Sequence, residues 1–177
     1  CVEDSKTPKV MLPRVRRNSA VGIIEIASGC LSHCSFCQVK IAKECLVSYP
    51  PDVLIQEVVS AVKDGCREIW LTSQDNGCYG RDIHTSLPAL LKRLCKVDDS
   101  FHIRVGMMNP SQIKGFIDDL IEAYRHEKIF RFLHIPVQSG SNRILKLMNR
   151  EYVVDEFMGI VERFKHTYPD LTLSTDT

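Results

Sequence analysis

The sequence contains no run of eighteen or more apolar residues and no excess of charge of either sign. Without such a run no transmembrane helix is expected. The 23 lysines and arginines nearly balance the 22 aspartates and glutamates, so the net charge does not indicate binding to DNA or to a membrane surface. No signal peptide precedes the first predicted strand. The chain opens at Cys1 rather than at a methionine, so we expect a fragment of a longer protein.

Cysteine, by contrast, is plentiful, with eight residues in a chain of 177. A secreted protein would use them for disulfides. Here the helix-rich pattern and the missing signal favour a reducing cytoplasm, where clustered cysteines are more often metal ligands or redox groups. The hydrophobic content of 44% is enough for one globular domain with its own core.

The one local charge asymmetry lies within residues 1–20, in the string KTPKVMLPRVRR, which contains no acidic residue. Such a segment is either a solvated arm or a contact to a polyanion such as RNA. Its basic residues are Lys6, Lys9, Arg14, Arg16 and Arg17.

From residue 21 onward, short apolar or β-branched runs alternate with segments of helical period. This alternation is typical of βαβ units and a parallel sheet. Five strands make either a doubly wound sheet or part of a barrel. The predicted strands are 22–28, 67–73, 101–107, 130–137 and 171–176. The predicted helices are 51–64, 86–97, 111–125 (with Ser111 as its N-cap), 141–148 and 153–166.

Polar residues gather directly after the predicted strands. In parallel β/α architectures the active site lies at the carboxyl ends of the strands. The pattern therefore predicts an enzyme with one active face. The residues concerned are Cys30, Gln74, Asp75, Asn76, Met108, Asn109, Pro110, Gln138, Ser139, Gly140 and Asp176.

Three cysteines stand within the string SGCLSHCSFCQVK, in a C-x3-C-x2-C spacing. A structural zinc site usually has four protein ligands arranged as two close pairs, and here only His33 or Cys45 is near enough to be the fourth. An iron–sulfur cube also binds thiolates, and a tight loop with three of them leaves one iron open for a cofactor or substrate atom. The spacing suits the open cluster better, with zinc as the alternative.

The triplet resembles the signature of the radical S-adenosylmethionine (SAM) superfamily, in which an aromatic residue commonly precedes the third cysteine, as Phe36 does here. Further strings resemble the tRNA methylthiotransferases, especially the archaeal and eukaryotic branch that acts on N6-threonylcarbamoyladenosine. These strings are SYPPDVLIQEV, EIWLTSQDNGCYGRD, IRVGMMNP, FLHIPVQSGSNRILKLMNREY and LSTDT. The resemblance implies a partial (β/α)6 radical-SAM barrel, truncated after strand five, with 1–20 as a basic N-terminal arm and 21–177 as the core domain.

The resemblance also implies the cofactors and the residues that hold them. A [4Fe-4S] cluster would bind to Cys30, Cys34 and Cys37, and SAM would chelate the open iron. An electron from the cluster then cleaves SAM, and the resulting radical abstracts a hydrogen atom. Candidate SAM contacts are Phe36, Ser73, Gln74, Asp75, Arg104, Gln138, Ser139 and Asp176. Candidate substrate contacts are Lys43, at a position where relatives often carry arginine, and Asn109.

Several of these residues also have a structural interpretation. Gln74 and Asp75 suit a turn, and Gln138 and Ser139 suit the cap of the following helix. Arg104 lies within a strand and suits a structural ion pair, and Asp176 suits a turn or a cap. Elsewhere, a hydrogen-bonded core position is expected for His134, core packing for Met107 and Met108, and burial as small hydrophobes for Cys66 and Cys95.

The implied substrate is tRNA, with a methylthio group inserted at C2 of the modified adenosine next to the anticodon. The family's N-terminal domain, with a second [4Fe-4S] cluster, and its C-terminal RNA-binding barrel have no counterpart in residues 1–177. We therefore expect this chain alone to hold one cluster and to be inactive in thiotransfer. No motif identifies the electron donor. The alternatives are another radical SAM enzyme, such as a bacterial-type methylthiotransferase or a methyltransferase, and a non-enzymatic zinc or RNA-binding module.

Overall fold

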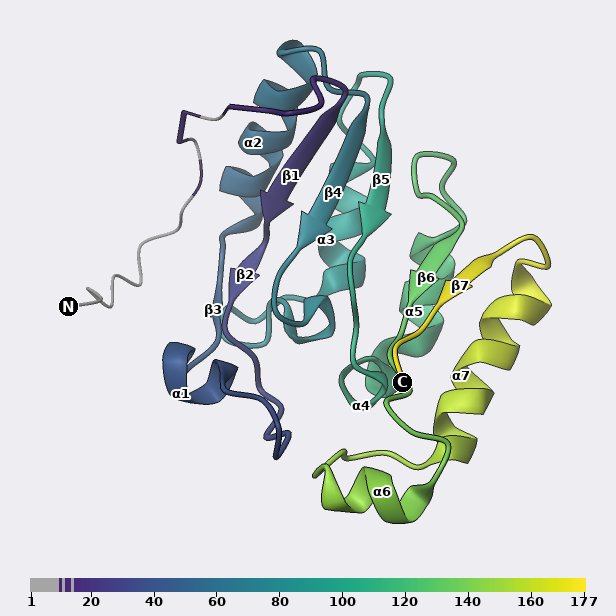
Figure 1. The fold of residues 1–177 in the computed structure, drawn as a ribbon. Coiled ribbons are helices and arrows are strands. Elements are labelled where there is room, and N and C mark those ends of the chain that lie inside the picture. Colours follow the sequence, from purple (N-terminus) through teal and green to yellow (C-terminus); the bar gives the residue numbers. More distant parts are fainter. Residues whose placement is uncertain (1–9, 11, 14) are drawn as a thin grey trace.

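A central parallel sheet and a second short sheet organise the computed structural model, which describes residues 10, 12–13 and 15–177 (Figure 1). The central sheet has the order β1-β4-β5, and β6 pairs in parallel with β7. An isolated parallel bridge between Ile103 and Ile129 joins β5 to the segment before β6. These strands are β1 (Val21–Glu25), β4 (Glu68–Thr72), β5 (His102–Val105), β6 (Phe132–His134) and β7 (Thr172–Ser174).

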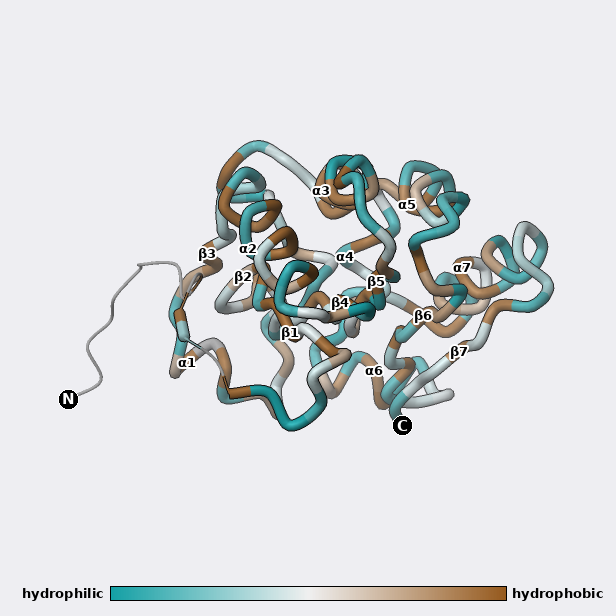
Figure 2. Tube along the Cα trace, turned by 90° about the horizontal axis from the view of Figure 1, so that it is seen from above, coloured by the Kyte–Doolittle hydropathy of each residue, from teal (hydrophilic) through white to brown (hydrophobic). Residues whose placement is uncertain are grey.

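Helices connect the strands, and three of them lie along one side of the sheet. Seen from above, α2, α3 and α5 follow the arc of β1, β4, β5 and β6 (Figure 2). This is the arrangement of an open barrel with its helices outside. Within the described residues, no helix is both long and apolar enough to cross a membrane. The helices are α1 (Val39–Lys43), α2 (Pro51–Lys63), α3 (Leu87–Leu94), α4 (Pro110–Ile113), α5 (Ile117–Ala123), α6 (Asn142–Leu147) and α7 (Val154–Thr167).

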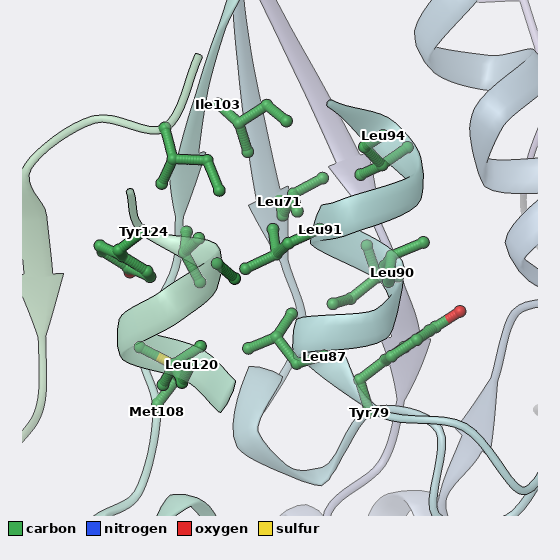
Figure 3. Packing of buried hydrophobic residues seen from close by; sticks show 14 of the residues in the cluster. Leu71, Tyr79, Leu87, Leu90, Leu91, Leu94, Ile103, Met108, Leu120 and Tyr124 are labelled. Carbon is green, nitrogen blue, oxygen red and sulfur yellow. The ribbon is translucent and has the colours of Figure 1, made fainter. Parts of the chain in front are cut away.

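The core lies between the central sheet and these helices, and α3 shows how the sequence builds it. Ser86 caps the helix by accepting a hydrogen bond from the Ala89 amide. One face of α3 packs on side chains of β4, β5 and α5 (Figure 3). Burial of each leucine contributes about 2 kcal/mol. The buried leucines of α3 are Leu87, Leu90, Leu91 and Leu94.

The structure departs from the sequence-based prediction in two places. The predicted strand 22–28 divides after β1, and its end forms β2 (Ala27–Ser28), which pairs antiparallel with an unpredicted strand, β3 (Val47–Ser48). The predicted helix 111–125 is likewise broken into α4, a 3₁₀ turn η2 (Lys114–Phe116) and α5. Gly115 lowers the helix propensity there, and the backbone of Phe116 leaves the helical region, with φ −138° and ψ 28°. The cap of α4 is Asn109, not Ser111.

The basic arm is only partly described. Lys6, Lys9 and Arg14 lie outside the described residues. Arg16 donates from Nη1 to Oδ2 of Asp64, at the end of α2, over 3.1 Å. An ion pair this exposed contributes little to stability. The choice between a solvated arm and a polyanion contact stays a prediction.

Gly29 ties the end of β2 to the cysteine loop, and alanine there should destabilise the fold. Its φ is +85°, and an added Cβ would lie 2.1 Å from the carbonyl oxygen of Cys45. We expect Gly29→Ala to lower the free energy of unfolding by about 2–4 kcal/mol in urea denaturation. The matched control is Gly159→Ala, in the middle of α7 with no atom within 4 Å of the added Cβ. This control should stabilise the protein by roughly 0.5–1 kcal/mol. Equal effects of the two substitutions would contradict the expectation.

Candidate functional site

The three clustered cysteines lie on the loop that follows β2, at the end of the molecule to which the strands of the central sheet point (Figure 1). They are free thiols, with Cys30 and Cys34 half-buried and Cys37 exposed. The loop is anchored to the far end of the chain: Ser35 donates its amide to the carbonyl of Met148 over 3.0 Å, and Asn149 donates from Nδ2 to the carbonyl of His33 over 2.7 Å.

Two of the sulfurs accept hydrogen bonds from nitrogen donors. The amide of Ser32 lies 3.3 Å from the Sγ of Cys30, and Nη1 of Arg150 lies 3.1 Å from the Sγ of Cys34. N–H donors and a cation stabilise negative charge on sulfur. The donor set is therefore three unpaired thiols on one short loop, two of them hydrogen-bonded by N–H donors. These residues fit a thiolate-ligated cluster.

Asp75 is the buried centre of the site and is only 1% exposed. Its Oδ1 accepts the amides of Gly77 and Asn109, over 2.9 and 3.1 Å. Its Oδ2 faces two sulfurs, Cys78 at 3.4 Å and Cys30 at 3.9 Å. Burial, together with negative charge on Cys30, raises the pKa of Asp75 to about 7.

The two thiols beside Asp75 respond in opposite directions. The hydrogen bond from Cys78 lowers the pKa of Cys30 to about 5, since it stabilises the thiolate. The same hydrogen bond raises the pKa of Cys78, and so does burial. Cys30 therefore favours the thiolate while Cys78 keeps its proton, which is the arrangement of a ligand supported by a neighbouring donor.

The residues before Asp75 join the cysteine loop to the end of β4. Gln74 accepts the amide of Gly29 at its Oε1 over 2.7 Å, directly before the first cysteine. Ser73 donates from Oγ to Oδ1 of Asn76 over 3.1 Å, within the turn that leads into η1 (Asn76–Cys78). The predicted turn chemistry is thus present, and it places the side chain of Gln74 beside the cysteine loop.

Asn109 links three parts of the site. Its Oδ1 caps α4 through the Ser111 amide and also accepts from Nη2 of Arg150, over 3.2 and 3.1 Å. Its Nδ2 donates to the hydroxyl of Ser32 over 2.9 Å. Because Asn109 is buried, these bonds hold the end of β5, the cysteine loop and the Arg150 segment in register.

The other sequence-predicted residues lie around this centre. Arg104 stacks between the rings of Trp70 and Phe132, at 4.8 and 4.4 Å, rather than in the expected ion pair. Phe36 is 53% exposed, and Lys43, the last residue of α1, is also exposed.

The end of β7 meets the segment after β6. The amide of Gln138, which has φ +65°, donates to the carbonyl of Asp176 over 2.8 Å. The carboxylate of Asp176 lies 3.0 Å from Nε2 of the half-buried His134. The hydroxyl of Ser139 accepts the amide of Ser141 over 3.2 Å, so it closes a turn before α6. The positions of Gln138, Ser139 and Asp176 at strand ends agree with the predicted face.

Sequence reasoning missed Arg150 and Ser32, and it noted Cys78 only as a cysteine near the predicted active face, without naming its partner. Arg150 belongs to the string MNREY, and 116 residues separate it from the sulfur that it contacts. Cys78 follows Asp75 by three residues in a turn, a spacing that returns its thiol to the carboxylate. That short-range spacing was the available signal for Cys78. The predicted burial of Cys66, Cys95 and Met108 is confirmed.

Comparison with known proteins identifies the class. A family model of the radical SAM superfamily matches residues 24–176, and the chain belongs to that superfamily. The chain is 47% identical to a probable threonylcarbamoyladenosine tRNA methylthiotransferase of Pyrococcus abyssi. The matching 168 residues make up 95% of this chain and 40% of the relative. Over 166 residues it is 43% identical to the threonylcarbamoyladenosine tRNA methylthiotransferase of Drosophila melanogaster, covering 93% of this chain and 30% of the relative.

A solved structure supports the fold. The radical SAM methyltransferase TsrM of Kitasatospora setae matches 88% of this chain and 30% of its own, with a TM-score of 0.66 and 15% identity. The prediction of a partial radical-SAM barrel is therefore confirmed. The chain spans less than half the length of the curated relatives named above.

Proposed function

We propose that this chain is the radical-SAM core of an enzyme that converts N6-threonylcarbamoyladenosine in tRNA to its 2-methylthio derivative, next to the anticodon. The observation that carries the proposal is the loop of three free thiols at the carboxyl edge of the sheet, two of them hydrogen-bonded by N–H donors. Identity of 47% and 43% to relatives bearing that enzyme name supports the substrate.

Cys30, Cys34 and Cys37 would hold a [4Fe-4S] cluster. The TsrM structure carries a cluster of this type, which supports the assignment. When bound together, the cluster and SAM supply a radical able to remove hydrogen from an unactivated C–H bond. The C2–H of adenine is unreactive toward ordinary acid–base chemistry, so that supply suits the proposed reaction.

The chain's own residues would position these groups. The Ser32 amide and Arg150 orient the sulfurs of Cys30 and Cys34. Asp75, through Cys30 and the amides of Gly77 and Asn109, fixes the loop against the ends of β4 and β5. This preorganisation leaves little rearrangement to be made when the cofactors bind.

SAM would lie along the same face. We assign its contacts to side chains at the strand ends and on the loop, with Phe36 available to stack on the adenine because its ring is exposed. The proposed SAM contacts are Phe36, Ser73, Gln74, Asp75, Arg104, Gln138, Ser139 and Asp176. Asp75 would act through its neighbours, because its carboxylate is buried. Lys43 and Asn109 are assigned to the substrate. Lys43 would contact the substrate directly, and Asn109 would act through the backbone of α4, which it caps.

The domain division and partners follow from the same proposal. Residues 1–20 are the basic arm and 21–177 the core, with tRNA bound mainly by parts of the enzyme beyond this chain. A second [4Fe-4S] cluster belongs to those parts, so the chain alone should be inactive in thiotransfer. The free thiols support a reducing, cytoplasmic location.

Arg150 should tune the cluster. Replacing it by glutamine removes a cation and an N–H donor from the sulfur of Cys34. The reduced cluster carries more negative charge than the oxidised one, so it should lose more stabilisation, and the midpoint potential should fall by tens of millivolts, about 30 mV or more. A redox titration monitored by electron paramagnetic resonance measures this midpoint potential.

The matched control is Arg143→Gln, which removes an equal charge from the exposed face of α6. We expect this control to leave the potential within about 10 mV of the wild-type value, because exposed charges are screened. An unchanged midpoint potential in Arg150→Gln would show that Arg150 does not tune the cluster.

A nucleoside profile tests the substrate. Deleting the gene that encodes this chain should remove 2-methylthio-N6-threonylcarbamoyladenosine from tRNA hydrolysates and leave the unthiolated nucleoside in its place. Loss of 2-methylthio-N6-isopentenyladenosine instead would assign the enzyme to the bacterial-type branch. An unchanged set of methylthio nucleosides would reject the proposed reaction.

A further inference from the structure

We propose that Cys78, Asp75 and Cys30 form a binding site for a thiophilic divalent cation such as Zn²⁺, adjoining the cysteine loop. One oxygen and two sulfurs meet there from two segments: the turn that leads from β4 into η1 supplies Asp75 and Cys78, and the loop after β2 supplies Cys30. The donor set differs from the C-x3-C-x2-C triplet, because it uses only the first of those three cysteines.

The distances suit a small metal ion. The three ligand atoms all lie within 4.8 Å of one another. Zinc bonds of about 2.0 Å to oxygen and 2.3 Å to sulfur place neighbouring tetrahedral ligands roughly 3.5–3.8 Å apart. Oδ2 of Asp75 already lies 3.4 Å from the sulfur of Cys78 and 3.9 Å from that of Cys30. The third distance, between the two sulfurs, is at most 4.8 Å.

The surrounding structure fixes the ligands. Both amides that bind Asp75 use Oδ1, which leaves Oδ2 directed at the thiols alone. The side chain of Cys78 is fully buried, and its amide bonds to the carbonyl of Asp75 over 3.1 Å. Cys30 is half-buried, whereas Asp75 and Cys78 are almost fully buried, so a cation would enter from the side of Cys30.

Charge and protons balance on binding. A divalent cation binds both sulfurs as thiolates and displaces to solvent the proton that Cys78 holds. The two thiolates match the charge of the ion, and the carboxylate gives the complex one net negative charge. The carboxylate adds a third bond, and a water molecule takes the fourth position, as in zinc sites with three protein ligands. No oxidant or reductant is needed.

Sharing of Cys30 has a consequence that rests on the proposed function. One thiolate cannot serve both this site and a cluster in the proposed geometry, so the two metals exclude each other. Zinc bound before iron should therefore block cluster assembly, and the block should depend on Cys78, which is outside the cluster's own ligand set.

Cobalt titration tests the site directly. Co²⁺ is added anaerobically to reduced, metal-free protein, and thiolate-to-cobalt charge-transfer and ligand-field absorption report coordination. We expect one tight site in the double variant Cys34→Ala/Cys37→Ala, because that variant keeps all three ligands. When Cys78→Ala is added to this double variant, we expect its affinity for cobalt to fall more than about tenfold. Losing even an outer-shell partner of a metal costs that much.

The matched control is Cys66→Ala, another fully buried cysteine outside this group, which should bind cobalt like the parent protein. Circular dichroism of each variant verifies the fold. Unchanged cobalt affinity and spectrum in a folded Cys78→Ala variant would overturn the proposal. Loss of cobalt binding in a folded Cys34→Ala/Cys37→Ala variant would overturn it too, because it would assign the metal to the triplet.

Cluster loading separates this proposal from the proposed function. Cys78→Ala should still take up iron and sulfide, and zinc should no longer prevent it. The parent protein should lose cluster loading when zinc is added first, and unimpeded loading there would contradict the exclusion. Failure of the zinc-free parent to load any cluster would count against the proposed function, while the cobalt result would still decide the cation site.

Discussion

Replacing Cys34 by alanine is expected to abolish cluster binding. Anaerobic reconstitution of the parent chain should give about four irons and four sulfides per protein, whereas the variant should retain few or none. The loop supplies only three thiolates, so losing one leaves the cluster with two protein ligands. Cys34 is also the ligand whose sulfur Arg150 contacts, so no other thiol can take its place without losing that contact. Iron and sulfide analysis measures the effect.

Cys45→Ala is the matched control for this experiment. Cys45 is exposed and lies only eleven residues further along the chain, but outside the triplet. The control should load like the parent protein. Normal loading of Cys34→Ala, or equal loss in Cys45→Ala, would show that the triplet is not the ligand set.

Asp75→Ala should be the most destabilising polar substitution in the site. It leaves the buried amides of Gly77 and Asn109 without their acceptor. An unsatisfied buried donor costs about 1–3 kcal/mol, so the free energy of unfolding should fall by about 2–5 kcal/mol. Urea denaturation of the metal-free chain measures this loss separately from any effect on cofactors.

Asp75→Asn separates the acceptor from the charge. Its amide oxygen can replace Oδ1 and keep both backbone hydrogen bonds, so the variant should lose less than half as much stability as Asp75→Ala. Equal losses would mean that the charge on Asp75, rather than its acceptor oxygen, holds the segments together.

The sequence predicted the elements whose signal is local. The periodic leucines of α3 and the apolar face of α2 define helices without tertiary information. The C-x3-C-x2-C spacing singled out the cysteine loop as the predicted ligand loop for the same reason, because all three thiols lie within eight residues. Placement of polar residues after strands then predicted which residues would share one edge, and Asp75 and Asn109 do meet there.

What the sequence did not reveal depends on long-range packing. The β2–β3 pairing joins runs of two residues each, too short for any periodic pattern. The helix break at 114–116 is an exception, because Gly115 was a local signal against a continuous helix that the apolar period masked. Arg150 reaches the sulfur of Cys34 only because the chain beyond α6 folds back under the cysteine loop. Contacts of this kind follow from topology rather than from spacing.

Electron paramagnetic resonance of the reconstituted, reduced chain tests whether the three cysteines hold a cluster with an iron left open for SAM. Spectra are recorded without SAM and then with SAM in excess, on protein freed of zinc. We expect the signal of a reduced [4Fe-4S] cluster, and a change in that signal when SAM binds to the iron that no cysteine holds. A cluster signal that SAM leaves unchanged, or the failure of zinc-free protein to form a cluster, would contradict this expectation.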